Sequence, residues 1–419
     1  MLKVIENTAK FLIICLPIFL VTGPLLSDLS VVILDIIFLA IIFSEKKYHI
    51  LNNKYFKFLI LLWLYFSIRS LLADDIILSF KSSFFHIRFI ILIWAISFFF
   101  ERDNKLINTF SKIFIFTIIF ICIDALIQYF LGTNIIGFKS LNSDKLNGMF
   151  GDEAVLGSYL IRLTPLIFAI LYFNFDPNKF KLIYLFTLLT LGLVIFLSGS
   201  RSSLFLFFLF SLLFFFINTQ IRKSLIISFV AIALSLTFVS QFNKKISHSV
   251  YYNLYDPIRT IFLDIDNPDR ENKPKFIFTK VYDAHYRTAY KMFDNNKFFG
   301  VGTKMYRKLC NNEKYYINEY SCTTHPHNFY LQLLAENGFI GFFGIFSIFL
   351  YILIIILKKI YDINFRKEEF NQYSYLMILV GIFINLWPIV PSGNFFNNWL
   401  SIVIFFPISF LIFFSRKKN

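Results

Sequence analysis

The chain has 419 residues, of which 57% are hydrophobic and 16% are charged, and its formal net charge is +15. The apolar residues come in blocks near the roughly 20 residues that are needed to cross the hydrocarbon core of a bilayer. This composition excludes a soluble globular domain and predicts an all-α polytopic membrane protein.

The positive charge lies in alternate connections between the apolar blocks, which is the distribution expected of cytoplasmic loops. No basic face carries the interleaved aromatic residues of a nucleic-acid groove, so we expect no nucleic-acid partner. The basic connections contain Lys3 and Lys10; Lys46, Lys47, Lys54 and Lys57; Arg102, Lys105 and Lys112; Lys179 and Lys181; Arg222 and Lys223; Lys358, Lys359, Arg366 and Lys367; and Arg416, Lys417 and Lys418.

Between these connections the apolar blocks predict about twelve membrane-crossing helices, which places both chain ends in the cytoplasm. The first block has a basic flank, as a signal peptide has. No small-residue cleavage site follows it, so we expect it to stay as a helix. The helices are expected at residues 11–26, 29–43, 55–72, 84–100, 110–131, 154–173, 180–197, 202–217, 225–239, 339–357, 372–389 and 395–414.

This topology predicts three parts of the chain. Residues 1–240 hold the first nine helices, residues 241–338 form a periplasmic loop with an interfacial helix, and residues 339–419 hold the last three helices. The periplasmic side also receives residues 132–153 and the turn at 198–201. A loop as long as the late one is usually functional or disordered, and its many Tyr and Phe residues allow it to pack.

Two of the four cysteines, Cys310 and Cys322, lie in the late periplasmic loop. An oxidising periplasm favours a disulfide between them, and two free thiols are the alternative. Cys15 and Cys122 lie inside apolar helices, where small buried side chains are expected.

A His-Pro-His-Asn tetrapeptide at residues 325–328 ends the only long polar stretch of the chain. Asn328 is the expected N-cap of a short amphipathic helix at 329–336, which Asn337 and Gly338 stop. His327 is therefore expected at the positive end of a helix, which lowers the pKa of an imidazole and keeps it neutral, as a general base must be. A capping or packing histidine is the alternative.

Five further residues are candidates for substrate contact because of their charge or their place at a helix start. Arg201 and Ser200 open a helix after a Ser-Gly-Ser turn, where free N–H groups and a guanidinium suit a diphosphate. A snorkelling arginine is the alternative there. Arg69, Arg88 and Arg162 lie in or near the outer halves of crossings, where charge is by default functional. Each could instead pair with a carboxylate such as Asp74, Asp75, Asp152 or Glu153.

Over about residues 148–344 the chain resembles the O-antigen ligase family, which also contains O-antigen polymerases and O-linked protein oligosaccharyltransferases. Three elements carry the resemblance: SGSR at 198–201, GVG at 300–302 after NKFF, and the string HPHNFYLQLLAENG at 325–338. In that string, a family histidine followed by ten residues and a glycine matches His327 and Gly338.

Two family arginines match with less specificity. The first is followed by three residues and a leucine in the family; it matches Arg201, although Phe205 replaces the leucine. The second lies in the periplasmic loop ahead of the GVG element, and it matches Arg287.

The resemblance implies an inner-membrane glycosyltransferase whose active site faces the periplasm and whose donor is an undecaprenyl-diphosphate-linked glycan. His327 would take the proton from an acceptor hydroxyl, while Arg201 and Arg287 hold the diphosphate leaving group and the anomeric carbon inverts. No metal or other cofactor is required in that scheme, because guanidinium groups supply the positive charge. The expected substrate-binding residues are Arg69, Arg88, Arg162, Ser200, His325 and Asn328, and the rival base or cation site is Asp152 with Glu153.

The acceptor is expected to be lipid A-core or another hydroxyl compound, as for a ligase, and a polymerase of repeat units on the lipid carrier is the alternative. A glycolipid transporter is the alternative from another class. A transporter should show charged or broken helices near the midplane, whereas the polar residues here gather at the outer face.

Overall fold

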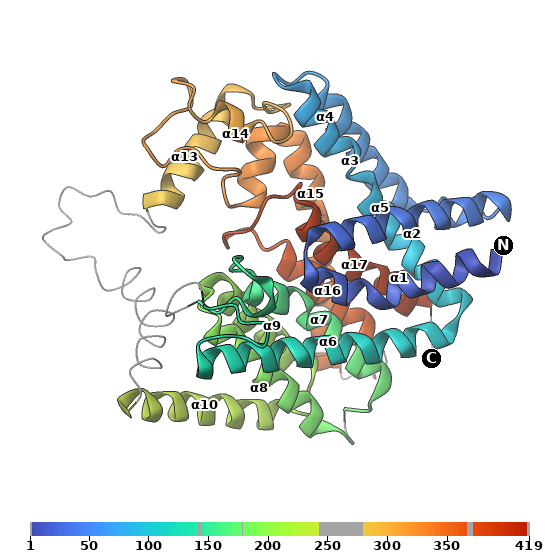
Figure 1. Ribbon diagram of the computed structural model, residues 1–419, viewed down its shortest axis with the longest axis vertical. Helices are drawn as coiled ribbons and strands as arrows, with labels where there is room; N and C mark the ends of the chain where they lie inside the picture. Colours follow the sequence, from blue (N-terminus) through green and yellow to red (C-terminus); the bar gives the residue numbers. More distant parts are fainter. Residues whose placement is uncertain (1, 141–144, 178, 243–279, 367–371, 417–419) are drawn as a thin grey trace, which may run out of the picture. The chain divides into compact units, whose positions relative to one another are not determined.

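The computed structural model describes residues 2–140, 145–177, 179–242, 280–366 and 372–416 (Figure 1). In this part of the chain the regular elements are helices, and one isolated β-bridge joins Thr133 and Lys139. The helices are α1 (Leu2–Thr22), α2 (Pro24–Ser44), η1 (Tyr48–Leu51), α3 (Lys54–Ser70), α4 (Ile76–Phe84), α5 (Ile87–Arg102), α6 (Asn104–Leu131), η2 (Gly148–Phe150), α7 (Leu156–Asn174), α8 (Lys181–Leu197), α9 (Arg201–Ile217), α10 (Arg222–Phe242), α13 (Lys280–Asn295), α14 (Tyr306–Leu309), α15 (Phe329–Tyr361), η7 (Asp362–Arg366), α16 (Tyr373–Asn385) and α17 (Asn398–Arg416).

Within the described residues, seven helical spans are long and apolar enough to cross a membrane. Three shorter helices, α8, α9 and α16, are also apolar. The prediction of an all-α polytopic membrane protein is therefore confirmed, while the count of about twelve crossings stays a prediction. Leu25 is 77% exposed and Leu182 is 79% exposed, as expected for side chains that face acyl chains.

Several expected helices differ from the observed ones at their ends; for example, α1 begins at Leu2 and ends at Thr22, where residues 11–26 were expected. Two further differences lie near the candidate site. The block expected at 84–100 begins with a break, because α4 ends at Phe84 and α5 begins at Ile87. Helix α16 ends at Asn385, short of the expected residue 389. Pro388 and Pro391 explain the second difference, since proline lacks an N–H and disfavours helical backbone in the residue before it.

The chain divides into two compact units, and the first contains Met1–Phe110, Phe278–Ile355 and Asn385–Lys418. In this unit α17 packs along α5, where the rings of Phe100 and Phe410 have centroids 5.0 Å apart. Arg102 at the end of α5 forms ion pairs of 2.6 Å with Glu6 and 2.7 Å with Glu45. These pairs join α1, α2 and α5 at the end that the positive-inside pattern places in the cytoplasm.

The second unit contains Ser111–Ile277 and Ile356–Ile384. Helix α7 packs against α8 and α9, and the rings of Phe168 and Phe214 have centroids 4.6 Å apart. A Cβ on Gly157 would lie 2.3 Å from the Ser198 Oγ, so the start of α7 touches the turn before α9 directly.

The segment expected as a periplasmic loop at 132–153 is anchored on α6 by buried polar side chains. Gln128 donates to the Asn147 Oδ1 over 2.7 Å and accepts from the Gly148 N–H over 2.8 Å. Asp124 accepts from the Ile135 N–H over 3.0 Å. In the late loop, residues 243–279, which include Tyr251, Tyr252 and Tyr255, lie outside the described residues.

Candidate active site

Three histidines lie together at the start of α15. The His327 ring is 4.2 Å from that of His325 and 5.3 Å from that of His285, measured between centroids. Tyr282 meets the His327 ring edge-on at 5.5 Å. Tyr282 and His285 both belong to α13, which Figure 1 shows in gold beside the orange start of α15.

The backbone of His327 is held in an unusual conformation. Its φ is +55°, which lies in the left-handed region that residues other than glycine rarely adopt. Ser392, in the connection between α16 and α17, donates its N–H to the His327 carbonyl over 2.8 Å. The Ser392 Oγ accepts from the Phe329 N–H over 2.9 Å. The conformation therefore persists because a segment remote in the sequence binds the His327 carbonyl and the Phe329 N–H that follows it.

Asn328 caps α15, as the sequence suggests. Its side-chain oxygen accepts from the N–H groups of Tyr330 over 3.0 Å and Leu331 over 3.1 Å. Its side-chain amide donates to the Pro388 carbonyl over 2.7 Å. The cap thus has two partners, the first turn of its own helix and the connection that also holds His327.

The surroundings keep the histidines neutral. Burial, with a smaller contribution from the charge of His327, lowers the pKa of His325 to about 3 and the pKa of His285 to about 4. Burial also lowers the pKa of His327. A neutral imidazole has a lone pair that can accept a proton, so this cluster suits general-base chemistry.

The GVG element and Gly338, where the backbone of α15 leaves helical geometry and the helix is kinked, form one backbone junction. Val301 donates its N–H to the Ala335 carbonyl over 2.9 Å, and Gly302 donates to the Glu336 carbonyl over 2.8 Å. A Cβ on Gly300 would lie 2.4 Å from the Asn337 nitrogen, and a Cβ on Gly338 would lie 2.3 Å from the Phe298 carbonyl oxygen. Both glycines have positive φ, so the junction accepts no larger residue at either position.

Helix α3 holds this junction from the other side. Arg69 donates from Nε to the Phe299 carbonyl over 2.9 Å and from Nη2 to the Gly300 carbonyl over 2.6 Å. The Tyr65 hydroxyl donates to the Asn337 carbonyl over 2.6 Å. The Arg69 guanidinium thus binds main-chain carbonyls. The alternative to a substrate-binding role that the sequence offered was an ion pair with a carboxylate.

Arg88 and Arg287 both lie beside carboxylates. Arg88 forms an ion pair of 2.9 Å with Asp28, a carboxylate that sequence reasoning did not single out. Arg287, on α13, lies 3.8 Å from Asp283, and its side chain is 60% exposed. Arg287 follows His285 by two residues, which is a rotation of about 200° around the helix axis. The two side chains therefore project from opposite sides of α13.

The second unit contains Ser200, Arg201 and Arg162. Ser200 is the N-cap of α9 and shares a hydrogen bond of 2.7 Å with the Ser203 hydroxyl. Arg201 is the first residue of that helix. Arg162 is buried in α7, where its Nε donates to the Ser158 Oγ over 3.2 Å.

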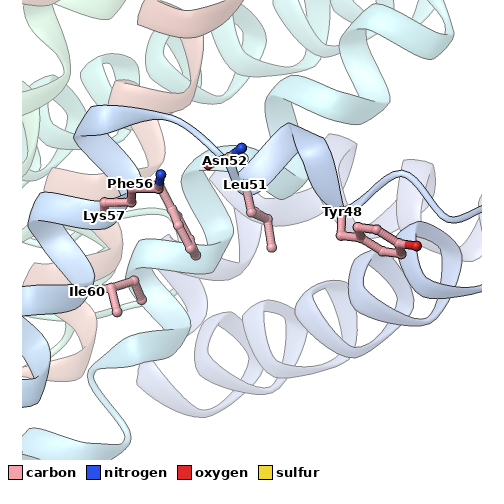
Figure 2. Close-up of a pocket in the computed structure, with 6 residues that line it drawn as sticks. All are labelled: Tyr48, Leu51, Asn52, Phe56, Lys57 and Ile60. Carbon is pink, nitrogen blue, oxygen red and sulfur yellow. The ribbon is translucent and has the colours of Figure 1, made fainter.

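The residues expected as a rival base, Asp152 and Glu153, follow η2 in the second unit, and both side chains are exposed. Among the described residues, no group of three or more His, Cys, Asp or Glu side chains is arranged to hold a metal ion. A cavity of about 340 Å³ lies elsewhere, beside η1 and the start of α3 (Figure 2). It contains none of the candidate site residues and is lined by Tyr48, Leu51, Asn52, Phe56, Lys57 and Ile60.

A disulfide lies behind the histidine cluster. Cys310 and Cys322 are joined by an S–S bond of 2.05 Å. Tyr306 belongs to the same buried cluster as Cys310, and its hydroxyl donates to the Ser321 carbonyl over 2.7 Å and to the His285 carbonyl over 3.3 Å. The bond closes the loop that supports the buried side of α13.

Sequence reasoning missed His285, Ser392 and Asn394. Asn394 accepts from the Gln332 amide over 3.1 Å, which adds a further contact to the helix that follows His327. One signal could have found His285: Tyr282, His285 and Ala289 have helical spacing, so they share one face of α13.

The fold and this site define a polytopic membrane protein with a histidine cluster beside a backbone junction at the start of a long helix. Residues 186–346 match the model of the O-antigen ligase family, which confirms the family prediction. No curated protein matches the chain. The matched region includes both Arg201 and His327, and it indicates a membrane glycosyltransferase of ligase or polymerase type that uses lipid-linked glycans.

Proposed function

We propose that the protein is an O-antigen ligase of the bacterial inner membrane. It moves an undecaprenyl-diphosphate-linked glycan onto lipid A-core at the periplasmic face, without a metal ion. The observation that carries the proposal is His327, a neutral and partly buried imidazole fixed by Ser392 in a left-handed backbone conformation. A residue held in so uncommon a conformation inside the family's most specific element is a strong candidate for the chemistry.

The reaction needs one proton acceptor and a stabilised leaving group. His327 takes the proton of the acceptor hydroxyl, and the oxygen then attacks the anomeric carbon on the face opposite the diphosphate. The bond from that carbon to the diphosphate oxygen breaks, and its electron pair leaves with the diphosphate. The family resemblance assigns Arg201 and Arg287 to the negative charge that develops there, and the anomeric configuration inverts.

Three further polar residues are proposed to bind the substrate. Arg162 is buried in a crossing, where an arginine is costly and by default functional, and Ser200 precedes Arg201 at the helix start. His325 lies in contact with His327. We assign these residues to substrate binding, whereas the contacts of Arg69, Arg88 and Asn328 favour positioning of the site.

Ligase and polymerase use the same donor and the same base, so the acceptor separates them. A ligase deletion strain should accumulate polymerised glycan on the lipid carrier, while its lipopolysaccharide stops at the core. A deletion strain whose core bears a single repeat unit would instead identify a polymerase.

A purified protein in detergent separates an enzyme from a transporter, because only an enzyme forms a glycosidic bond without a membrane barrier. We expect transfer of the lipid-linked glycan in the presence of a chelator. Activity that disappears with the chelator and returns with a divalent cation would favour Asp152 and Glu153 as a cation site.

A further inference from the structure

A second polar cluster lies next to the histidines, in the turn between Gly302 and α14. This turn is fixed by Glu336, which is fully buried in α15. Its Oε1 accepts from the Tyr306 N–H over 3.2 Å, and its Oε2 accepts from the Gln332 amide over 3.0 Å. Lys304 in the same turn has a φ of +59°, a further left-handed residue that is not glycine. The turn therefore holds Lys304 in a strained backbone conformation, as the chain does at His327.

The cations of this turn have few partners. Within the part of the chain that the structure describes, the side chains of Lys304 and Arg307 make no hydrogen bond or ion pair, and the Arg307 Nε is buried without a hydrogen-bond partner. The neighbouring Lys308 differs, because it is 53% exposed and forms an ion pair of 3.3 Å with Asp75. The buried carboxyl of Glu336 attracts both of these partly buried cations from beyond ion-pair distance, whereas the exposed Lys308 has a carboxylate within ion-pair distance.

Lys304 and Arg307 are three residues apart, and Tyr306, which lies between them in the sequence, donates its hydroxyl to the His285 carbonyl over 3.3 Å, so the turn lies next to the histidine cluster. Burial, followed by the charge of Arg307, lowers the pKa of Lys304. Arg307 is also among the charges that lower the pKa of His325. Holding two like charges together in a partly buried place costs free energy, and a bound anion offsets that cost.

We propose that Lys304 and Arg307 form a subsite for a phosphate group of a lipid-linked substrate, beside the histidine cluster. The subsite rests on the proposed function and adds two residues to it, neither of which belongs to the family elements quoted above. The phosphate is carried either by the donor, as part of its diphosphate, or by a phosphorylated acceptor saccharide. In both cases charge-assisted hydrogen bonds from an ammonium and a guanidinium bind it.

Binding of inorganic pyrophosphate to the purified full-length protein, measured by calorimetry, tests the subsite without any transfer reaction. Lys304→Asn removes the charge and tolerates a left-handed backbone, since asparagine adopts it more readily than most residues. Lys308→Gln is the matched control. We expect wild type and Lys308→Gln to bind equally, and Lys304→Asn to bind about tenfold more weakly or worse.

Arg307→Gln is a second variant, and it should weaken binding about as much as Lys304→Asn if both side chains contact the anion. Its thermal midpoint should stay near that of wild type, which keeps the test valid if Lys304→Asn folds poorly. Equal pyrophosphate affinity in wild type and Arg307→Gln would overturn the subsite, and so would a wild-type protein that binds no pyrophosphate.

Kinetics of glycan transfer then identify the source of the phosphate. A tenfold rise in the KM for the lipid-linked donor in Arg307→Gln assigns the phosphate to the donor, and a rise in the KM for the acceptor assigns it to the acceptor. Unchanged KM values for both substrates would contradict the inference. A wild-type protein that binds pyrophosphate and transfers no glycan would contradict the proposed function and leave the subsite standing.

Discussion

The two regions that carry the family elements are built in different ways. The histidine region is held by backbone bonds between distant segments, from Ser392 to His327 and from Val301 to Ala335. The turn before α9 is held by its neighbours, since the Ser198 hydroxyl donates to the Ile195 carbonyl over 2.7 Å and Ser200 caps the helix. The proposed base, His327, must be held at one position relative to the substrate, and contacts between distant segments hold it there. The turn before α9 presents N–H groups of its own helix start, so local contacts are enough to form it.

Gly338→Ala should have the largest effect, because it breaks the scaffold of the histidine region. The new Cβ would lie 2.3 Å from the Phe298 carbonyl oxygen at a backbone with positive φ. We expect little folded protein and no glycan transfer. Gly132→Ala is the control, since Gly132 also has a positive φ but nothing lies within 4 Å of its Cβ position.

The control separates steric overlap from backbone strain. Left-handed backbone costs a residue with a Cβ about 1–2 kcal/mol, and overpacking at Gly338 adds about 1–3 kcal/mol or more. Thermal midpoints of the two purified variants measure the difference. An equal fall in both midpoints would show that the junction tolerates a side chain.

Arg201→Ala should abolish transfer while the protein level stays normal, because the proposed role of that guanidinium is to hold the leaving group. Loss of a group that stabilises developing charge costs about 10²–10³-fold in rate. Arg287→Ala should be severely impaired for the same reason. Asp283→Ala, which removes the carboxylate beside Arg287, is the control and should retain most activity. Near-normal transfer by Arg201→Ala would remove the leaving-group assignment.

Removal of the Cys310–Cys322 bond should lower the free energy of unfolding and have only a small effect on the rate of glycan transfer. Closing a loop of this length stabilises a folded protein by about 2–4 kcal/mol. Peptide mapping without reductant should recover the linked pair, and Cys122, which is a free cysteine, serves as the internal control. Recovery of both loop thiols as alkylated cysteines from native membranes would reject the bond.

Asn328→Ala should lower stability less than Gly338→Ala or the loss of the disulfide does. Loss of an N-cap costs about 1 kcal/mol, and the Pro388 contact is lost with it. Asn53→Ala removes the cap of α3, whose side chain accepts from the Phe56 N–H over 2.9 Å, and costs about the same. Transfer should fall severalfold only in Asn328→Ala. Equal activity of the two variants would mean that the cap does not position His327.

Local parts of the site could be predicted from the sequence. Asn328 as a cap and the break in helical geometry at Gly338 follow from the chemistry of helix ends, which depends on neighbouring residues. The same holds for Ser200 before α9. The all-α membrane fold follows from the lengths of the apolar blocks.

Partners that are remote in the sequence could not be predicted in this way. Arg69 binds the carbonyl of Phe299, 230 residues away, and no local pattern connects the two. His285 reaches His327 from another helix, and Ser392 lies in a connection that was expected to be partly helical. Each of these contacts depends on tertiary packing, which a single sequence does not show.

The central claim is that His327 is the base of glycan transfer, and the rate of purified His327→Ala tests it most directly. We expect a loss of about 10²–10⁴-fold, with a smaller loss in His325→Ala and none in His49→Ala, whose residue lies in η1. Because burial lowers the pKa of His327, wild-type activity should persist as the pH falls to the ordinary histidine pKa of about 6.5 and decline only below it, as the base becomes protonated. A His327→Ala protein that transfers glycan within about tenfold of the wild-type rate would contradict the claim.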